Sequence, residues 1–401
     1  MTQNKTKKIW RQPWGYSEGI IIALGLLITG LALDFFTGIA IPKPAFPYNI
    51  SLATFLISVL VLVYLNRKKS PLIRWLSSVP AAISSLGLFT FISVLMGLIP
   101  QKQAAGPGIF NLLDSWAYLL AYVWLLIVLG LSALKRVKPL KSRNIAYLLN
   151  HWGLWIALAA AGLGSGDVQK LNMYLQEGKT TWYAYDENRN RVELPFAFKL
   201  NDFVLENYPS KIALISKQKN EIISRNNKPL IADLPFDDSL KMGGFKIRTK
   251  KYVTNAVPIK GKQYQPSNDT GSVQAAYFEI DNTIDGWASP GNFMYGTTVI
   301  SLNDSVALGM LKPEAKRYAS EVRLFTKDGQ KKVQTIEVNK PLKTEGWKVY
   351  QTDYDQRFGR WSRLSVLELV RDPWLPVVYI GLFMMIFGSL WLIFQGKTKK
   401  S

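Results

Sequence analysis

The sequence lacks cysteine altogether and contains a single histidine, His151, among its 401 residues. Without cysteine the chain can form no disulfide, no thiolate metal site and no cysteine nucleophile. The long segment that follows residue 165 has neither histidine nor cysteine, so it holds no Ser-His-Asp set and no His or Cys metal cluster. We therefore do not expect this segment to catalyse such chemistry alone.

Acidic residues are nearly missing from the two ends of the chain. Only Glu18, Asp34 and Asp114 precede Asp167, and none follows Asp372. These ends hold 18 basic residues against three acidic ones, a net of +15 out of the formal +21. The distribution predicts membrane, soluble and membrane blocks, and the positive charge marks membrane topology. The sequence has no phosphate loop and no nucleic-acid signature, so a nucleic-acid partner is not expected.

Six segments are apolar and long enough to cross a membrane, which takes roughly 20 residues. They cover 18–36, 51–65 with a possible start at Tyr48, 76–100, 112–134, 145–164 and 374–394. The first has no nearby small-x-small cleavage site, so we expect a retained anchor. The predicted division is a cytoplasmic N-terminus (1–17), a five-helix membrane region (18–165), an extracytoplasmic β-rich domain (166–372), a final transmembrane helix (373–394) and a cytoplasmic tail (395–401).

Basic residues in short loops indicate the orientation, because they gather on the cytoplasmic side. The loops alternate between basic ones and ones that hold only Lys43 or Lys102. The basic stretches contain Lys5, Lys7, Lys8 and Arg11, then Arg67, Lys68, Lys69 and Arg74, then Lys135, Arg136, Lys138, Lys141 and Arg143, and finally Lys397, Lys399 and Lys400. The pattern predicts a multi-pass protein of the cytoplasmic (inner) membrane, in contact with lipid, with both termini cytoplasmic and residues 166–372 on the outer or periplasmic side.

The block from 166 to 372 has the pattern of an all-β, sandwich-like domain of one or two units. Apolar and polar residues alternate over 196–201, the period of a half-buried strand. The other predicted strands cover 181–185, 211–216, 244–253, 273–280, 297–302, 321–327, 331–338 and 347–354. Asp328-Gly329 predicts a hairpin turn between two of them. The stretches 264–271 and 285–296 are predicted to be loops, with Trp287 and Phe293 in the second.

The fifth apolar segment carries His151. At 3.6 residues per turn, Tyr147, His151 and Trp155 are expected on one helix face. His151 lies about 9 Å into the segment at 1.5 Å per residue, which places it in the cytoplasmic half of the membrane. An intramembrane histidine indicates a group that faces the bundle interior and binds or relays something, and neutral imidazole is a good ligand for haem iron. The residues alone leave a packing histidine equally open, with a proton relay as a third interpretation.

The end of the β block resembles a known family. The runs Ile336-Glu337-Val338-Asn339-Lys340-Pro341-Leu342 and Gly346-Trp347-Lys348-Val349-Tyr350-Gln351 are similar to the signature of ResB-type proteins, also called CcsB, which partner CcsA in system II cytochrome c biogenesis. The stretches 196–208 and 372–388 resemble the early strand and the final helix of this family. The resemblance covers about 150–401. Members commonly have three helices before the soluble domain, so the first two segments are unexplained.

The resemblance implies a role for His151. The family has a histidine, implicated in holding haem, in the last membrane helix before the soluble domain, and His151-Trp152-Gly153 occupies that place. It implies haem b as a transient, transported substrate, His151 as an axial ligand of its iron, and Tyr147, Trp152 and Trp155 as pocket residues. The WWD haem-handling motif belongs to the CcsA-like partner and is absent here. This chain has one histidine, so a second axial ligand would come from another subunit, from a weaker donor such as Met, or from a second copy of this chain.

The function implied is that of a membrane subunit of a cytochrome c synthetase. Such a subunit would help to carry haem outward and present it for attachment to apocytochrome c, beside a CcsA-like, WWD-motif membrane protein. Whether the chain itself counts as an enzyme stays open, since attachment is an activity of the complex. The alternative function is structural: a membrane-anchored β-sandwich scaffold of the cell envelope, in which His151 only packs.

Overall fold

The computed structural model describes residues 10–102, 106–138, 141–236, 238–261 and 263–396, apart from the side chain of Arg143. Lys5, Lys7, Lys8, Lys397, Lys399 and Lys400, which contributed to the predicted orientation, lie outside these residues. The chain divides into two compact units. The helical unit comprises Met1–Val168 and Asp372–Ser401, and the β unit comprises Gln169–Arg371.

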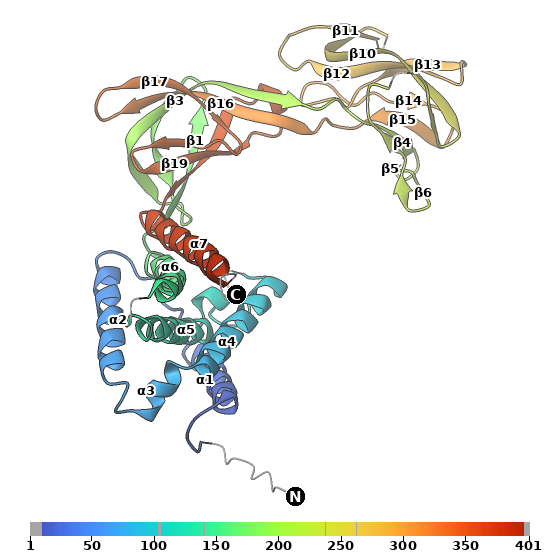
Figure 1. The fold of residues 1–401 in the computed structure, drawn as a ribbon. Coiled ribbons are helices and arrows are strands. Elements are labelled where there is room, and N and C mark those ends of the chain that lie inside the picture. Colours follow the sequence, from blue (N-terminus) through green and yellow to red (C-terminus); the bar gives the residue numbers. More distant parts are fainter. Residues whose placement is uncertain (1–9, 103–105, 139–140, 237, 262, 397–401) are drawn as a thin grey trace, which may run out of the picture. The chain divides into compact units, whose positions relative to one another are not determined.

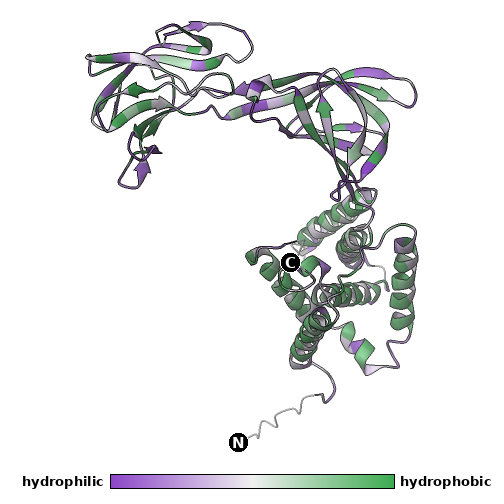
Figure 2. Cartoon of the chain, turned by 180° about the vertical axis from the view of Figure 1, so that it is seen from behind, coloured by the Kyte–Doolittle hydropathy of each residue, from purple (hydrophilic) through white to green (hydrophobic). Residues whose placement is uncertain are grey.

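The helical unit contains six helices long and apolar enough to cross a membrane among the residues described, as predicted. They are α1 (Tyr16–Thr37), α2 (Tyr48–Leu65), α4 (Val79–Leu98), α5 (Trp116–Leu134), α6 (Ser142–Leu163) and α7 (Leu375–Gly396). Figure 2 shows these helices as almost uniformly hydrophobic. They make the chain a multi-pass membrane protein, because a bilayer accepts only segments whose backbone polar groups are bonded internally.

Two helices begin later than the apolar runs predict. The third run, predicted over 76–100, starts at the last residue of a short helix, α3 (Pro71–Leu76), and continues as α4 only after Ser77 and Ser78. The fourth run opens with a 3₁₀ turn, η1 (Leu112–Asp114), and α5 starts only after Ser115, whose Oγ accepts a hydrogen bond from the Ala117 N–H at 3.1 Å. Hydropathy does not detect these starts because serine caps and turns are set by local hydrogen bonds.

Helix α5 is the most enclosed of the six, and its neighbours are arranged around it in Figure 1. Buried side chains such as Ala121, Leu126, Val128 and Leu131 lie along its length. Two apolar clusters form on it, one with α1, α3 and α4 and the other with α2 and α6. The packing of α4 and α6 against α5 defines the space between these three helices.

The first part of the β unit is one antiparallel sheet of eight strands. Its order is β17 (Lys331–Glu337), β16 (Ala315–Thr326), β3 (Arg191–Asn207), β2 (Thr180–Tyr185), β1 (Gln169–Gln176), β20 (Leu364–Arg371), β19 (Trp347–Tyr354) and β18 (Leu342–Thr344). Strand β17 also contacts β18 and β19, so the sheet curls until its two ends meet. Its core, with Leu175, Phe198, Val322 and Leu367, lies inside this curl.

The second part of the β unit is a sandwich of two five-stranded sheets, as the sequence predicts. One contains β11 (Gln263–Pro266), β10 (Phe245–Ile259), β12 (Val273–Ile280), β13 (Ile284–Ala288) and β9 (Leu240–Met242). The other contains β14 (Ile300–Ser301), β15 (Val306–Met310), β4 (Ile212–Ser216), β5 (Glu221–Ile222) and β8 (Ile231–Ala232), beside the ribbon of β6 (Ser224–Arg225) and β7 (Lys228–Pro229). Leu214, Ile247, Phe278 and Leu308 join the two sheets in one core.

Several predictions in this unit are confirmed and others are wrong. Strands β12 and β19 have the predicted bounds, and Gly329 sits at φ +74° in the predicted hairpin turn. The predicted loop over 285–296 is wrong at its start, because Trp287 lies in β13. The turn comes earlier, at Asp281 and Asn282, both with positive φ, so Asp285-Gly286 falls inside the strand. The predicted loop over 264–271 likewise begins inside β11, and the predicted strand over 297–302 is reduced to β14.

Candidate functional site

A cavity of about 740 Å³ lies between α4, α5 and α6. From α6 it is lined by Asn144, Tyr147, His151, Leu154 and Leu158, a stripe with helical spacing. The other walls come from Ser77, Ser78, Val79, Ala82, Ser85, Leu86 and Phe89, from Leu125, Val128, Leu129 and Ser132, and from Lys135, Arg136 and Lys138. The volume falls within the range of pockets that hold small molecules and cofactors.

His151 lies in this cavity with one ring nitrogen engaged. Its Nδ1 is 3.1 Å from the carbonyl oxygen of Tyr147, one turn earlier in α6. A carbonyl can only accept, so this hydrogen bond requires the proton on Nδ1. The lone pair then resides on Nε2, for which the part of the chain described here offers no partner. A histidine whose Nδ1–H is held by a backbone carbonyl is the usual form of a neutral metal ligand.

Tyr147 holds the imidazole in place from one side. The two rings stack with centroids 3.6 Å apart and planes 22° apart. The guanidinium of Arg136 lies over the tyrosine ring at 4.3 Å, a cation–π contact that extends the stack. The three groups therefore form a column from the basic end of the cavity to His151.

The cavity is cationic at one end and apolar along the rest of its walls. Lys135, Arg136 and Lys138 form the cationic end, and none of them has an ion pair among the described residues. The Lys135 Nζ reaches the carbonyl oxygen of Ser77 at 3.5 Å. Leu154, Leu158 and Phe89 contribute to the apolar part. This combination suits an apolar ligand that carries acidic groups at one end.

The two predicted tryptophans lie outside this cavity. Trp155 is 6% exposed and packs with Leu60 and Leu131, and its indole N–H donates to the carbonyl oxygen of Leu126 at 3.0 Å. Trp152 packs edge-on against Trp155, with centroids 5.5 Å apart. At 100° per residue Trp155 lies about 80° from Tyr147 around the helix, beyond the stripe that faces the cavity. Of the four predicted pocket residues, the structure brings Tyr147 and His151 together in the cavity.

Contact with α7 fixes the rotation of α6. Its side opposite the cavity carries Gly153, and α7 presents Gly381 and Gly388. A Cβ on Gly381 would come within 2.6 Å of the Gly153 carbonyl oxygen, and one on Gly388 within 2.8 Å of the Ala146 carbonyl oxygen. Such backbone contact requires residues without side chains. The Asn150 amide also donates to Ser389 Oγ at 2.6 Å.

A carboxylate holds the helix ends together away from the cationic end. Asp167 accepts hydrogen bonds from the Phe46 N–H at 2.7 Å, the Asn49 amide at 2.6 Å and the Trp374 indole at 2.7 Å. The Phe46 N–H, followed by the Trp374 and Asn49 side chains, lowers the pKa of Asp167. Asp372 accepts from the N–H groups of Trp374 and Leu375 at 3.0 Å and so caps α7. These bonds support the cavity indirectly, by holding α2, α6 and α7 at their ends.

The runs that resemble ResB-type proteins form a folding element of the curled sheet. Asn339, Glu345 and Gly346 adopt positive φ in the turns on either side of β18. Gln351 is buried, and its Oε1 accepts hydrogen bonds from Ser320 Oγ at 2.6 Å and Ser365 Oγ at 3.1 Å. Among the described residues of the chain there is no group of three or more histidine, cysteine or acidic residues that could hold a metal ion.

Comparison with known proteins identifies one region of the chain. Residues 300–363 match the model of the ResB-like family. The match contains both runs quoted above, whereas 196–208, 372–388 and His151 lie outside it. No curated protein matches the chain.

Proposed function

We propose that the chain, of which residues 300–363 match the ResB-like family, is the membrane subunit of a cytochrome c synthetase that binds haem in the cavity between α4, α5 and α6. The observation that carries the proposal is the state of His151. Its Nδ1–H is held by the Tyr147 carbonyl, which leaves the Nε2 lone pair as the ligand for iron.

The rest of the cavity supports haem as the substrate. The cations at one end, Lys135, Arg136 and Lys138, offer charge-assisted hydrogen bonds to the two propionates. Leu154, Leu158 and Phe89 provide apolar surface for the macrocycle. Tyr147 positions the imidazole through the ring stack and is a positioning residue. Trp152 and Trp155 act through the packing of α6.

The proposal includes a direction and a partner. With the basic loops on the cytoplasmic side, haem enters at Arg136 and leaves toward the outer side, where the β unit resides. The chain has one histidine, so a second strong ligand comes from another subunit, which we propose to be the CcsA-like, WWD-motif protein. That complex would present haem b to apocytochrome c in the cytoplasmic membrane.

The test is the absorption of the protein purified with its partner from haem-replete cells. We expect a Soret band that His151→Ala strongly reduces, together with loss of cytochrome c maturation. The matched control is Leu148→Ala, on the same helix but outside the cavity lining. The idea fails if the purified complex has no Soret band, or if His151→Ala leaves both the band and the maturation intact.

One observation favours the structural alternative. The His151 ring is already stacked on Tyr147 and hydrogen-bonded to its own helix, as expected of a histidine that only packs. In that case the chain is a membrane-anchored scaffold. His151→Ala would then lower the melting temperature without any change in bound haem, which separates the two functions.

A further inference from the structure

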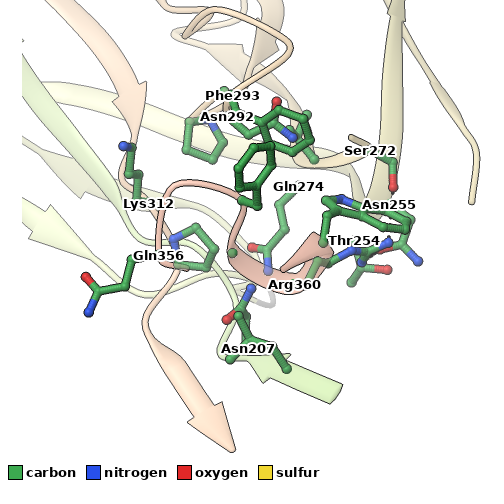
Figure 3. Close-up of a pocket in the computed structure, with 18 of the residues that line it drawn as sticks. Asn207, Thr254, Asn255, Ser272, Gln274, Asn292, Phe293, Lys312, Gln356 and Arg360 are labelled. Carbon is green, nitrogen blue, oxygen red and sulfur yellow. Dashed lines mark hydrogen bonds between the residues drawn. The ribbon is translucent and has the colours of Figure 1, made fainter. Parts of the chain in front are cut away.

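The β unit contains a pocket of about 480 Å³ that the proposed function does not use. Its walls come from the end of β3, from β10 and β12, from the loop after β13, and from the segment 354–361, which includes η2 (Gly359–Trp361). Figure 3 shows Arg360 near Asn255 and Ser272, with Asn292, Phe293 and Lys312 across the pocket. The pocket lies at the junction of the curled sheet and the sandwich.

Arg360 carries a partly buried charge without a carboxylate partner. Its guanidinium donates to the side-chain oxygen of Asn255 and to Ser272 Oγ, the latter at 3.1 Å, and lies 4.5 Å from the centre of the Trp361 ring. Both acceptors are neutral, and no ion pair involves Arg360 in the described ranges. Burial lowers the pKa of Arg360. A guanidinium fixed in this way is prepared for an anion, because burying an unpaired charge is costly.

Other charges at the pocket add to its positive character. Lys312 and Lys316 line it, and neither ammonium group has a hydrogen bond or ion pair among the residues described. The lining acid Glu206 pairs with Arg317 at 2.9 Å, and Glu337, which shares Arg317, also pairs with Lys340 at 3.3 Å, so these four charges balance. Asp355, next to the pocket, forms an ion pair with Arg357 at 2.7 Å. Three cations therefore remain for a ligand.

An aromatic pair lies beside these cations. The rings of Phe293 and Phe358 are 4.8 Å apart, and each residue is 40% exposed. The loop that carries Phe293 is fixed by Asn292, whose amide donates to the Gly271 carbonyl at 2.6 Å and accepts from the Met294 N–H at 2.8 Å. The apolar surface is therefore preorganised, which reduces the entropy lost on binding.

We propose that this pocket binds an acidic segment of a partner polypeptide that also carries apolar side chains. An aspartate or glutamate side chain would bind Arg360, and an adjacent apolar side chain would pack on Phe293 and Phe358. Aromatic residues and arginine dominate the binding energy of protein interfaces, and Lys312 and Lys316 provide for further carboxylates along the same segment. The inference does not depend on haem binding.

The experiment measures fluorescence anisotropy with the full-length protein in detergent. The probe is a labelled short peptide of alternating Glu and Phe, and the matched probe has Gln in place of every Glu. We expect the Glu peptide to bind at least about tenfold more tightly, and Arg360→Gln to remove about that factor. Binding should weaken as salt rises. Lys331→Gln, an exposed residue of β17 outside the pocket, should leave the affinity unchanged.

Three results would overturn the inference: equal binding of both peptides, unchanged affinity in a folded Arg360→Gln variant, or competition by free succinate that matches the unlabelled Glu peptide at equal carboxylate concentration. The last result would indicate a small-molecule site. If Arg360→Gln does not fold, Lys312→Gln with Lys316→Gln replaces it, because both lysines are unpaired in the residues described. Unchanged affinity of that folded variant would also contradict the inference.

Discussion

The position of one proton on His151 determines what this residue can do. The Tyr147 carbonyl keeps it on Nδ1, and the Nε2 lone pair is left without a partner among the described residues. The sequence predicts part of this site: the lone histidine draws attention to residue 151, and helical spacing adds Tyr147. The same spacing adds Trp155, which does not line this cavity, because an i, i+4 partner can still lie at the edge of a helix face. From the sequence, Arg136 is only one of the basic residues that indicate the cytoplasmic side. Its contact with Tyr147 could not be predicted, because it depends on the tertiary packing of α5 and α6.

Glu337 offers a test at the same scale. Hydrogen bonds from Arg317, at 2.8 Å, and then from Lys340 lower the pKa of Glu337. A carboxyl with a lowered folded-state pKa stabilises the protein above its unfolded pKa, about 4.3, and this contribution is lost as pH falls through the folded value. We expect Glu337→Gln to lower the melting temperature at pH 7, with the gap to wild type closing below about pH 4.

Glu345→Gln is the matched control for this measurement. Glu345 is exposed and has no ion pair among the described residues, so its replacement should produce no gap that closes in acid. A gap between Glu337→Gln and wild type that persists unchanged down to pH 3 would contradict the role given to the Arg317 pair.

At the scale of elements, helix α6 has two functionally different faces. One face meets α7 through Gly153, Gly381 and Gly388, and the other lines the cavity. Hydropathy and small residues predict that α6 spans a membrane and packs closely. They do not predict which helices complete the cavity, because the choice of α4 and α5 follows from packing among distant segments. Turn residues mislead in the same way at Asp285-Gly286, where cross-strand pairing with β12 prevails over local preference.

The contact between α6 and α7 can be tested directly, because the chain has no native cysteine. Asn150 and Ser389 touch through their side chains at 2.6 Å. We therefore expect the double variant Asn150→Cys, Ser389→Cys to form an intramolecular disulfide on mild oxidation, seen as a mobility shift that a reductant reverses. Adding Gly381→Leu should greatly reduce this cross-link, because the new side chain would collide with the backbone of α6.

Leu148→Cys paired with Ser389→Cys is the control, since Leu148 makes no hydrogen bond to α7 among the described residues. Equal cross-linking of the two pairs, or cross-linking of the Asn150 pair that survives Gly381→Leu, would mean that α6 and α7 do not pack through their glycines.

At the scale of the whole molecule, the family match and the candidate cavity lie in different units. The family match lies in the β unit, at residues 300–363. These residues have a structural role in the curled sheet, where the buried Gln351 side chain accepts a hydrogen bond from Ser320. The candidate haem cavity lies in the helical unit. The division into membrane and β blocks follows from the sequence, because it depends on the charge and hydropathy of long stretches. The curl of the eight-stranded sheet does not, since it depends on pairing between strands far apart in sequence.

The proposed orientation predicts which side of the membrane each unit meets. In the cysteine-free chain, Lys138→Cys and Lys219→Cys each introduce one exposed thiol, the first between α5 and α6 and the second in the β unit. A membrane-impermeant maleimide added to intact cells, or to spheroplasts where an outer membrane is present, should label the second and not the first. Labelling of Lys138→Cys alone would reverse the topology and place the cationic end of the cavity outside.

The central claim is that the Nε2 of His151 binds haem iron. The most direct measurement is the visible spectrum of the His151→Ala complex to which haem has been added, recorded before and after the addition of free imidazole. We predict that the variant loses the wild-type spectrum and that imidazole, which can occupy the space left in the cavity, restores it. A folded His151→Ala complex whose spectrum equals that of the wild type without imidazole would contradict the claim.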